Sequence, residues 1–304
     1  MDKNILITGA TGLVGRNLIG KLIERGDKVF VISRSADKAK KQLADISDAA
    51  SWDDEEKIIQ LINNADSIVN LAGENVMAQR WNEDHKKNIY DSRINTTAKL
   101  IQLIKRAESK PDSFVSASAV GYYGTGRNKE CTEDAPPGDD FLAKVTMDWE
   151  AEAQKVESAG VRRVSLRIGI VLSTEDGALA KMITPFKYFI GGPLGSGKQW
   201  FPWIHISDLT DFFIYAINMN MLSGPFNAVS PGIVTMKEFC KTMGKVMSRP
   251  SFFNVPSFVI KLIFGEGAGA VLSGNKIIPE NTLVRGFSFT YKHHEEALKN
   301  LLKD

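Results

Sequence analysis

The feature that most constrains the fold is a short apolar run, residues 4–8, followed at once by a loop with regularly spaced glycines. The loop carries Gly9, Gly12 and Gly15, and a segment with the apolar spacing of a helix starts within it. In a strand, loop and helix of this kind, the first glycine permits a tight turn and the second lets the backbone approach a pyrophosphate, while the third allows helix and strand to pack closely. The pattern predicts a dinucleotide site at the N-terminus of the first helix.

Short apolar runs alternate with longer segments of helical period over the first half of the chain. Runs such as residues 29–32 contain no alternating polar residues, which is typical of strands covered by helices on both faces. Repeated alternation of this kind predicts an α/β fold, a Rossmann doubly wound parallel sheet. The predicted strands are 4–8, 28–33, 67–71, 113–118 and 162–170, and the predicted helices are 14–25, 55–63, 82–108 and 143–158.

The alternation stops after about residue 171, where the loops become rich in glycine and proline. The later helical segments, 236–247 and 292–302, do not alternate with strands. A chain of 304 residues, 43% of them hydrophobic, is long enough for a large core and a smaller C-terminal α+β lobe. We expect this lobe to lie over the carboxyl ends of the strands, where open α/β sheets bind their ligands.

The end of the second predicted strand indicates which dinucleotide is bound. NAD-selective sites place an acid there for the ribose 2′-hydroxyl, but here the strand ends in Ser33 and Arg34. A guanidinium is suited to a 2′-phosphate, so NADP(H) is predicted, with NAD as the alternative.

Composition excludes several classes of partner. The net charge is only +2, so no strong field attracts nucleic acid or a membrane surface, and no apolar run is long enough to span a bilayer. Cys131 and Cys240 are far apart and lack the spacing of a zinc site or a disulfide framework, so no metal is predicted. With no leader before the first strand, we expect a cytoplasmic protein.

Residues 192–198, Gly-Pro-Leu-Gly-Ser-Gly-Lys, imitate a phosphate-binding loop of the ATPase type. Gln199 replaces the hydroxyl residue that would hold Mg²⁺, and the following Trp200, Phe201 and Pro202 cannot open the required helix. We therefore interpret the segment as a loop that covers a substrate.

Four motifs occur together along the chain: residues 70–75 (Asn-Leu-Ala-Gly-Glu-Asn), 80–82 (Arg-Trp-Asn), 92–94 (Ser-Arg-Ile) and 201–205 (Phe-Pro-Trp-Ile-His). Together they resemble an extended short-chain dehydrogenase/reductase, and more narrowly the subgroup called epimerase family protein SDR39U1-like, which is often labelled a nucleoside-sugar epimerase. The resemblance runs over essentially the whole chain. It implies an NADP-binding Rossmann domain of residues 1–171, completed by about 203–230, with the substrate lobe made of 172–202 and 231–304.

The resemblance also implies further cofactor contacts at the fourth strand end, on the long helix and after the sixth strand. Without it, residues 71–73 are simply a strand end with a turn glycine, and Arg93 is a charge on a helix surface. The predicted cofactor-binding residues are Gly9, Thr11, Gly12, Leu13, Val14, Gly15, Ser33, Arg34, Leu71, Ala72, Gly73, Arg93 and Val171.

Typical members carry Tyr-x-x-x-Lys on the helix after the fifth strand, because an ammonium lowers the pKa of a phenol that relays a proton. If Glu150 keeps its usual register, those two positions here are Leu142 and Thr146, so the ordinary relay is absent. Lys144 lies on a different face of the helix and is read as solvated.

Four residues could replace the missing pair. Ser118 matches the family's substrate-orienting hydroxyl, Tyr122 or Tyr123 could present a phenol, and Glu74 could act as an acid or base. Each has a plainer interpretation, in which the serine satisfies backbone groups and the tyrosines pack in the core.

Other polar residues are predicted to be structural. His205 lies in an aromatic stretch and is expected to be packed and hydrogen-bonded, and Asp208 is expected to cap or charge the next helix. His293 and His294 lack a third ligand and are expected to be solvated.

We expect an NADP(H)-dependent oxidoreductase or epimerase-like enzyme acting on a small hydroxyl or carbonyl compound, with a nucleotide-sugar as one candidate. The alternative is a non-catalytic NADP(H)-binding regulator that senses redox state. The amphipathic segment 82–108 could form a homodimer or could be covered by the chain's own loops, and the sequence does not identify the substrate.

Overall fold

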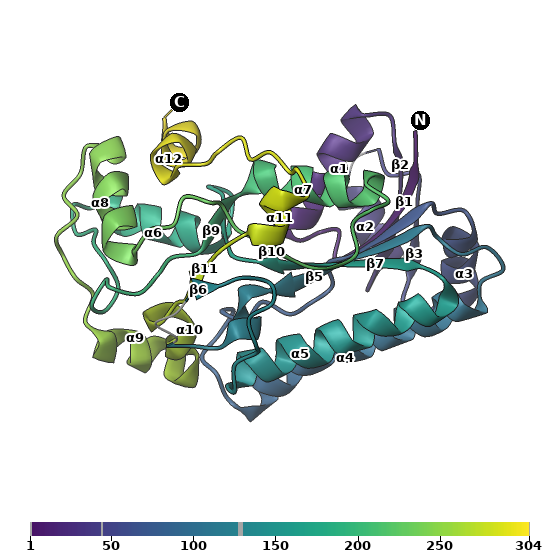
Figure 1. Cartoon of the computed structure of the whole chain (residues 1–304), viewed down its shortest axis with the longest axis horizontal. Helices are drawn as coiled ribbons and strands as arrows, with labels where there is room; N and C mark the ends of the chain where they lie inside the picture. The colour runs from purple at the N-terminus through teal and green to yellow at the C-terminus, as the bar shows by residue number, and fades with distance from the viewer. Residues whose placement is uncertain (1, 44, 127–129, 304) are drawn as a thin grey trace.

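A computed structural model describes residues 2–43, 45–126 and 130–303. Its centre is a parallel sheet of seven strands in the order β10-β7-β5-β4-β1-β2-β3 (Figure 1). The predicted α/β Rossmann fold is therefore confirmed. The strands are β1 (Asn4–Thr8), β2 (Lys28–Ser33), β3 (Asp48–Ser51), β4 (Ser67–Asn70), β5 (Ser113–Ala119), β7 (Arg162–Ile168) and β10 (Gly224–Ala228).

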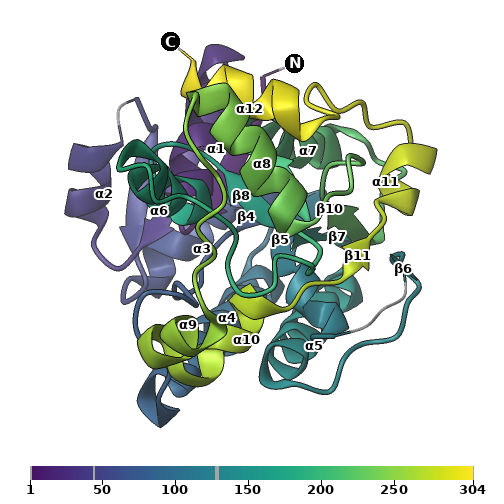
Figure 2. The ribbon, with the colours of Figure 1, turned by 90° about the vertical axis from the view of Figure 1, so that its left-hand side faces the viewer.

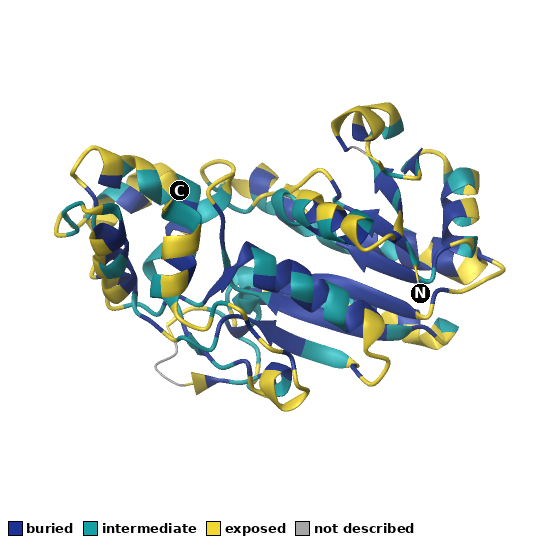
Figure 3. Cartoon of the chain, turned by 90° about the horizontal axis from the view of Figure 1, so that it is seen from above, coloured by how far each residue is buried: buried dark blue, intermediate teal, exposed yellow. Residues whose placement is uncertain are grey.

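Helices cover both faces of this sheet, and alternate strand residues contact different helices. In β1, Ile5 and Ile7 pack with α1 and α7, whereas Leu6 packs with α3, α4 and α5. Figure 3 shows the strands as a buried layer between partly exposed helices. The helices of these layers are α1 (Leu13–Glu24), α2 (Ala36–Gln42), α3 (Glu55–Asn63), α4 (Glu83–Arg106), α5 (Phe141–Gln154) and α7 (Ile206–Asn218).

The predicted strand 162–170 divides at Gly169. A Cβ atom at Gly169 would lie 2.4 Å from the carbonyl oxygen of Pro202, so only glycine allows this close approach. Beyond it, β8 (Ile170–Leu172) leaves the main sheet and pairs with β9 (Trp203–His205). The chain thereby leaves the Rossmann sheet at the point where the alternation of the sequence stops.

The C-terminal segments and residues 172–202 form a separate hydrophobic cluster, which includes Phe186, Phe239 and Leu298. This cluster supports the predicted division into a Rossmann domain and a substrate lobe, which stays a prediction. The remaining elements are α6 (Gly177–Lys187), α8 (Met236–Met247), α9 (Ser257–Phe264), α10 (Gly269–Leu272), α11 (Glu280–Val284) and α12 (His294–Leu302), with β6 (Glu130–Cys131) paired to β11 (Lys276–Ile277). Figure 2 shows two helices of the C-terminal segments, α8 and α12, side by side.

The apolar face of α4 is covered by the chain itself. Leu100, Ile101 and Ile104 pack in the core beneath the sheet, and Lys86 contacts Glu266 of the lobe. The predicted homodimer stays a prediction. Within the described ranges, no helix combines the length and apolarity needed to cross a bilayer.

Candidate functional site

The glycine loop between β1 and α1 has a backbone that larger residues cannot adopt. Gly9 has a φ of 69°, and a Cβ atom there would lie 2.5 Å from the carbonyl oxygen of Leu71. A Cβ atom at Gly15 would lie 2.6 Å from the carbonyl oxygens of Gly9 and Ala10. Glycine is therefore required at both positions for the loop, the helix and the neighbouring strand end to approach each other.

The N-terminus of α1 has the properties of an anion site. Gly12 is the N-cap residue and supplies no side-chain acceptor, and the first turn contains no acidic residue. The first N–H groups of a helix lack intrahelical partners and lie at the positive end of its dipole. A Cβ atom at Gly12 would have only the Gly9 carbonyl oxygen nearby, at 3.3 Å. These features fit the pyrophosphate of a dinucleotide.

The end of β4 is held against this loop by Thr8. The Thr8 hydroxyl accepts hydrogen bonds from the backbone N–H groups of Leu71 and Ala72, each at 3.2 Å, and donates to Asn70 at 2.7 Å. Residues 71 and 72 are thus fixed beside Gly9. Residues 71 and 72 are two of the predicted cofactor contacts, so this strand end is where those contacts are expected.

The end of β2 presents a cation and hydroxyl groups. The Ser33 hydroxyl donates to the carbonyl oxygen of Ser35 at 2.8 Å, and Ser35 caps α2 by accepting from the Lys38 N–H. Arg34 is exposed, and its guanidinium forms no hydrogen bond with the residues that the structure describes. It is therefore available to a phosphate group.

Arg93 of α4 lies against Gly73, as a Cβ atom at the glycine would be 3.1 Å from the guanidinium carbon. The guanidinium donates to the Ile89 carbonyl oxygen at 3.0 Å and lies 5.3 Å from the centre of the Trp149 ring. Burial lowers the pKa of Arg93 to about 10, although the charge of Glu74 acts in the opposite direction. Arg93 has therefore lost much of its hydration, and a polar ligand beside it would replace the lost contacts with water.

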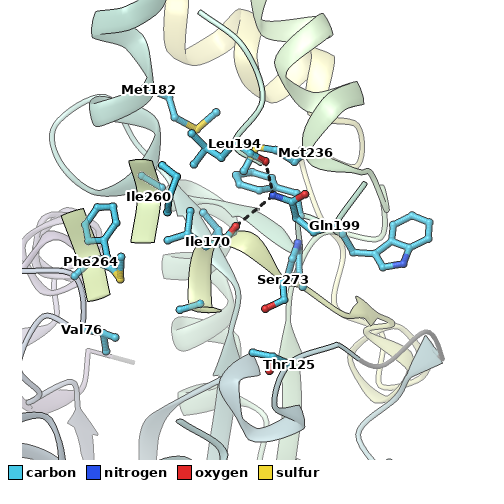
Figure 4. Close-up of a pocket in the computed structure, with 18 of the residues that line it drawn as sticks. Val76, Thr125, Ile170, Met182, Leu194, Gln199, Met236, Ile260, Phe264 and Ser273 are labelled. Carbon is cyan, nitrogen blue, oxygen red and sulfur yellow. Dashed lines mark hydrogen bonds between the residues drawn. The ribbon is translucent and has the colours of Figure 1, made fainter. Parts of the chain in front are cut away.

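A cavity of about 490 Å³ lies between the Rossmann sheet and the lobe (Figure 4). Gly177 at the start of α6 lines it, and a Cβ atom there would lie 3.9 Å from the Leu13 side chain, so the cavity adjoins the start of α1. The region that imitates an ATPase loop contributes Gly192 and Leu194 to the wall and forms no helix, as predicted for a covering loop.

The positions of the absent Tyr-x-x-x-Lys pair face the floor of this cavity. A Cβ atom at Gly121 would lie 3.4 Å from the Leu142 side chain and 3.5 Å from the Thr146 hydroxyl. Leu142 lines the cavity, and Thr146 donates to the Leu142 carbonyl oxygen at 2.7 Å. Neither residue can relay a proton to a ligand from this arrangement.

The comparisons with known proteins agree with this architecture. The model of the NAD dependent epimerase/dehydratase family matches residues 5–228, and a second model, described only as a domain of unknown function (DUF1731), matches residues 255–301. The first match runs from Ile5 in β1 to Ala228 at the end of β10. It includes the glycine loop and positions 142 and 146, where the catalytic pair is absent. The chain belongs to the NAD dependent epimerase/dehydratase family.

Relatives within this family match the full length of the chain. The epimerase family protein SDR39U1 homolog, chloroplastic, of Arabidopsis thaliana is 39% identical, covering 98% of this chain and 86% of that protein. Epimerase family protein YfhF of Bacillus subtilis is 38% identical, with 99% and 98% covered. The crystal structure of human epimerase family protein SDR39U1 with NADPH has a TM-score of 0.90 at 36% identity, with 98% of each chain covered. The subgroup inferred from the motifs is thus confirmed.

In this member of the epimerase/dehydratase family, Ser118 is buried and its hydroxyl is already engaged. It donates to Glu150 at 2.5 Å, and the same carboxylate binds Arg167 through two hydrogen bonds of 2.8 and 2.9 Å. Because the Ser118 hydroxyl already donates its hydrogen bond to Glu150, it can accept a hydrogen bond from a ligand but cannot donate one. Ser118 also does not line the cavity.

The two candidate tyrosines have different environments. Tyr123 is fully buried, donates to Asn227 at 2.7 Å and accepts from Arg167 at 2.9 Å. Burial raises the pKa of Tyr123, and its hydroxyl cannot reach the cavity, so the expectation that Tyr123 is catalytic is corrected to a structural role. The Tyr122 ring lies on the Arg167 guanidinium at 3.4 Å and is partly exposed.

Glu74 follows the end of β4, and its backbone N–H donates to Ser92 at 2.9 Å. Its side chain is partly exposed near Arg93 and does not line the cavity, whereas Asn75, Val76 and Met77 do. The structure therefore brings the loop residues 9–15, the ends of β2 and β4, and Arg93 together. None of the four candidate catalytic residues, Glu74, Ser118, Tyr122 and Tyr123, lines the cavity.

Among the remaining polar residues, His205 is packed as predicted. Its Nδ1 accepts from the Ser207 N–H at 3.0 Å, its Nε2 is 3.2 Å from Asn300 Oδ1, and its ring stacks on Tyr291. Burial lowers the pKa of His205 to about 4. Lys144 is exposed and paired with Asp148, as expected for a solvated side chain.

Asp208 lies in the first turn of α7 and charges it, which is one of the two roles expected; the cap itself is His205. The Asp208 carboxylate also accepts hydrogen bonds from the N–H groups of Thr290 and Tyr291, which join the C-terminal segment to α7. The expectation for His294 is wrong. His294 is half-buried and 2.9 Å from the Thr242 hydroxyl, rather than solvated.

Two polar residues of the cavity wall, Asp140 and Gln199, are not among the predicted site residues. Asp140 caps α5 through one carboxylate oxygen, and the other has no hydrogen-bond partner among the described residues. The Gln199 amide nitrogen donates to Leu194 and Val271, and its oxygen is also without a partner in the described part of the chain. The aspartate directly before α5 was the available signal for the first.

Proposed function

We propose that this chain binds NADP(H) and is an oxidoreductase or epimerase-like enzyme for a small molecule with a hydroxyl or carbonyl group. The observation that carries the proposal is the 490 Å³ cavity, which adjoins the start of α1 through Gly177 and Leu13. Cavities of this size at the carboxyl ends of an open α/β sheet are typical ligand sites. The human relative whose structure contains NADPH supports the choice of cofactor.

The residues present fit this cofactor. The N-terminus of α1 with Gly9, Gly12 and Gly15 would hold the pyrophosphate, Arg34 and Ser33 would bind the adenosine ribose phosphate, and the nicotinamide supplies hydride transfer when it is bound. The other residues proposed to line the dinucleotide are Thr11, Leu13, Val14, Leu71, Ala72, Gly73, Arg93 and Val171.

The chain's own contribution is to orient the substrate and exclude water. Leu142 and the apolar wall remove water from the floor of the cavity, which strengthens each remaining polar interaction. Ser118 could accept a hydrogen bond from a substrate hydroxyl only after its neighbours rearrange. Tyr122 and Glu74, which do not line the cavity, stay candidates for proton transfer.

The second candidate function is a non-catalytic regulator that binds NADP(H) and senses its redox state. The specific observation that favours it is the pair Leu142 and Thr146, which face Gly121 in place of a phenol and an ammonium. One of the two functions would be excluded by a direct comparison of turnover and binding.

The comparison uses a panel of aldehydes, ketones and alcohols, with NADPH or NADP⁺ consumption followed by absorbance. Turnover of any member at an ordinary enzymatic rate, of the order of 1 s⁻¹ or more, supports the enzyme. An epimerase returns the hydride to the same carbon and leaves the absorbance unchanged, so inversion of chiral alcohols is followed by chiral chromatography. If no member reacts in either assay, and the oxidised and reduced cofactors bind with affinities that differ about tenfold or more, the regulator is supported.

The cellular compartment stays a prediction. One relative is named chloroplastic and another is bacterial, so similarity does not decide between the cytoplasm and an organelle. We keep the cytoplasm as the proposed location.

A further inference from the structure

The charge of the cavity wall constrains the ligand. Among the described residues that line the cavity, Lys181 is the single cation and Asp140 the single anion, and Lys181 is exposed. The formal charges of the wall therefore cancel. A nucleoside diphosphate brings about two negative charges, and burying them without paired cations carries a large free-energy cost.

Two helix N-termini that could compensate for a phosphate group are already capped by carboxylates. Asp140 accepts from the N–H of Ala143 at the start of α5, and Asp176 accepts from the N–H of Gly177 at the start of α6. An anion at either end would meet the negative charge of the aspartate instead of free N–H groups. Neither helix therefore offers a diphosphate site.

The rest of the wall is largely apolar. Figure 4 shows Ile170, Met182, Leu194, Met236 and Ile260 around the cavity. Methionine side chains are flexible and adapt to irregular apolar ligands. The wall therefore suits the hydrocarbon part of a ligand and has few partners for the many hydroxyl groups of a sugar.

Two acceptor oxygens remain within this apolar wall, Asp140 Oδ2 and Gln199 Oε1, and neither has a partner among the described residues. A buried acceptor without a donor is unfavourable, so a ligand hydroxyl that reaches one of them relieves this penalty. Asn75, Thr125 and Ser273 add polar side chains to the wall, which offers a limited number of hydrogen bonds beside its larger apolar area.

One apolar residue of the wall also reaches the surface. Ile190 lines the cavity and is 57% exposed, whereas Ile260 of α9 lines it and is buried. The apolar lining therefore extends to the surface at Ile190.

We infer that the substrate of this cavity is an apolar molecule, a long-chain or cyclic hydrocarbon with one hydroxyl or carbonyl group, and not a sugar nucleotide. The inference rests on the proposed function, because it assigns the substrate class of the same site. It makes no use of the missing proton relay and can therefore be tested by binding alone.

The test uses the full chain saturated with NADP⁺ and the neutral fluorophore 1-aminoanthracene, whose emission rises in an apolar cavity. We expect saturable binding that 1-decanol and decanal displace and that millimolar UDP-glucose leaves unchanged. Displacement by UDP-glucose, or absence of fluorophore binding to protein that binds NADP⁺, overturns the inference. A failure of NADP⁺ itself to bind overturns the proposed function instead, so the two failures are distinguishable.

Two substitutions locate the fluorophore. Ala178→Phe places a ring in the cavity and is expected to weaken binding about tenfold or more, whereas Met221→Phe, at a site that is 77% exposed, serves as the matched control and leaves it unchanged. Met182→Glu, which adds a charge to the wall, is expected to give the same loss if Ala178→Phe does not fold. Undiminished affinity in a folded cavity variant contradicts the inference.

Discussion

Glu150 and Arg167 form a two-point ion pair below the carboxyl ends of β5 and β7, with side chains that are 13% and 3% exposed. Burial alone would lower the pKa of Arg167, but the hydrogen bonds and charge of Glu150 outweigh burial and raise it. The same guanidinium also donates to Tyr123 and to the carbonyl oxygen of Glu133. The pair therefore joins α5 and β7 to the segment between β5 and α5.

Replacing Glu150 leaves the Arg167 charge buried without its partner. Glu150→Gln is expected to reduce the free energy of unfolding by about 3–5 kcal/mol, the usual cost of breaking a buried pair, as measured by urea denaturation. Glu295→Gln, which removes an exposed pair with Lys245 and Lys299, is the control and should scarcely change stability. If Glu150→Gln lowers the free energy of unfolding by less than about 1 kcal/mol, the ion pair does not contribute substantially to stability.

Much of the fold could be predicted because its strands are continuous apolar runs and its helices have long amphipathic periods. The edge strand β3 was missed because Asp48–Ser51 is short and contains two alanines, which give little strand signal. The split at Gly169 depends on Pro202, which is far away in the sequence, so no local pattern could reveal it.

Gly12 is the loop glycine at which a methyl group would meet a bound pyrophosphate while causing little strain in the protein. Gly12→Ala is expected to weaken NADPH binding about tenfold or more with little change in melting temperature, because its Cβ would contact only the Gly9 carbonyl oxygen. Gly20→Ala on the same helix is the control, since nothing lies within 4 Å of its Cβ position. Equal NADPH affinity in both variants would place the cofactor elsewhere.

Arg34 is the cation that would distinguish NADPH from NADH. Arg34→Ala is expected to weaken NADPH binding about tenfold and to leave NADH binding nearly unchanged, because only NADPH carries the 2′-phosphate. Lys41→Ala, an exposed charge on the neighbouring α2, is the control for a general electrostatic effect. The measurement is fluorescence titration of both cofactors, and a parallel loss for NADPH and NADH would contradict the assignment.

His205 should make stability depend on pH. Its pKa is about 4 in the folded protein and 6.5 in the unfolded chain, so between these values the unfolded chain takes up a proton that the folded protein does not. Lowering the pH from 7.5 to 5 should therefore cost wild type about 2 kcal/mol more than the His205→Gln variant. Urea denaturation at both pH values checks this, and an equal loss in the two proteins would show that His205 is not held neutral.

The glycine loop and the end of β2 could be proposed from the residues alone because each is local to one loop or strand end. Residues 71–73, Arg93 and Val171 were implied only by the family resemblance. The cavity could not be predicted, because Leu142, Gln199 and Ile260 come from distant segments that meet only in the folded chain. Tyr123 was misjudged for the same reason, since its partners Arg167 and Asn227 lie far along the chain.

The central claim is that the N-terminus of α1, with the glycine loop and Arg34, binds NADP(H). Fluorescence titration of the purified chain with NADPH and NADH tests it most directly. The structure predicts saturable binding of both, with NADPH about tenfold tighter. The absence of a saturable signal with either nucleotide at millimolar concentration would contradict the claim.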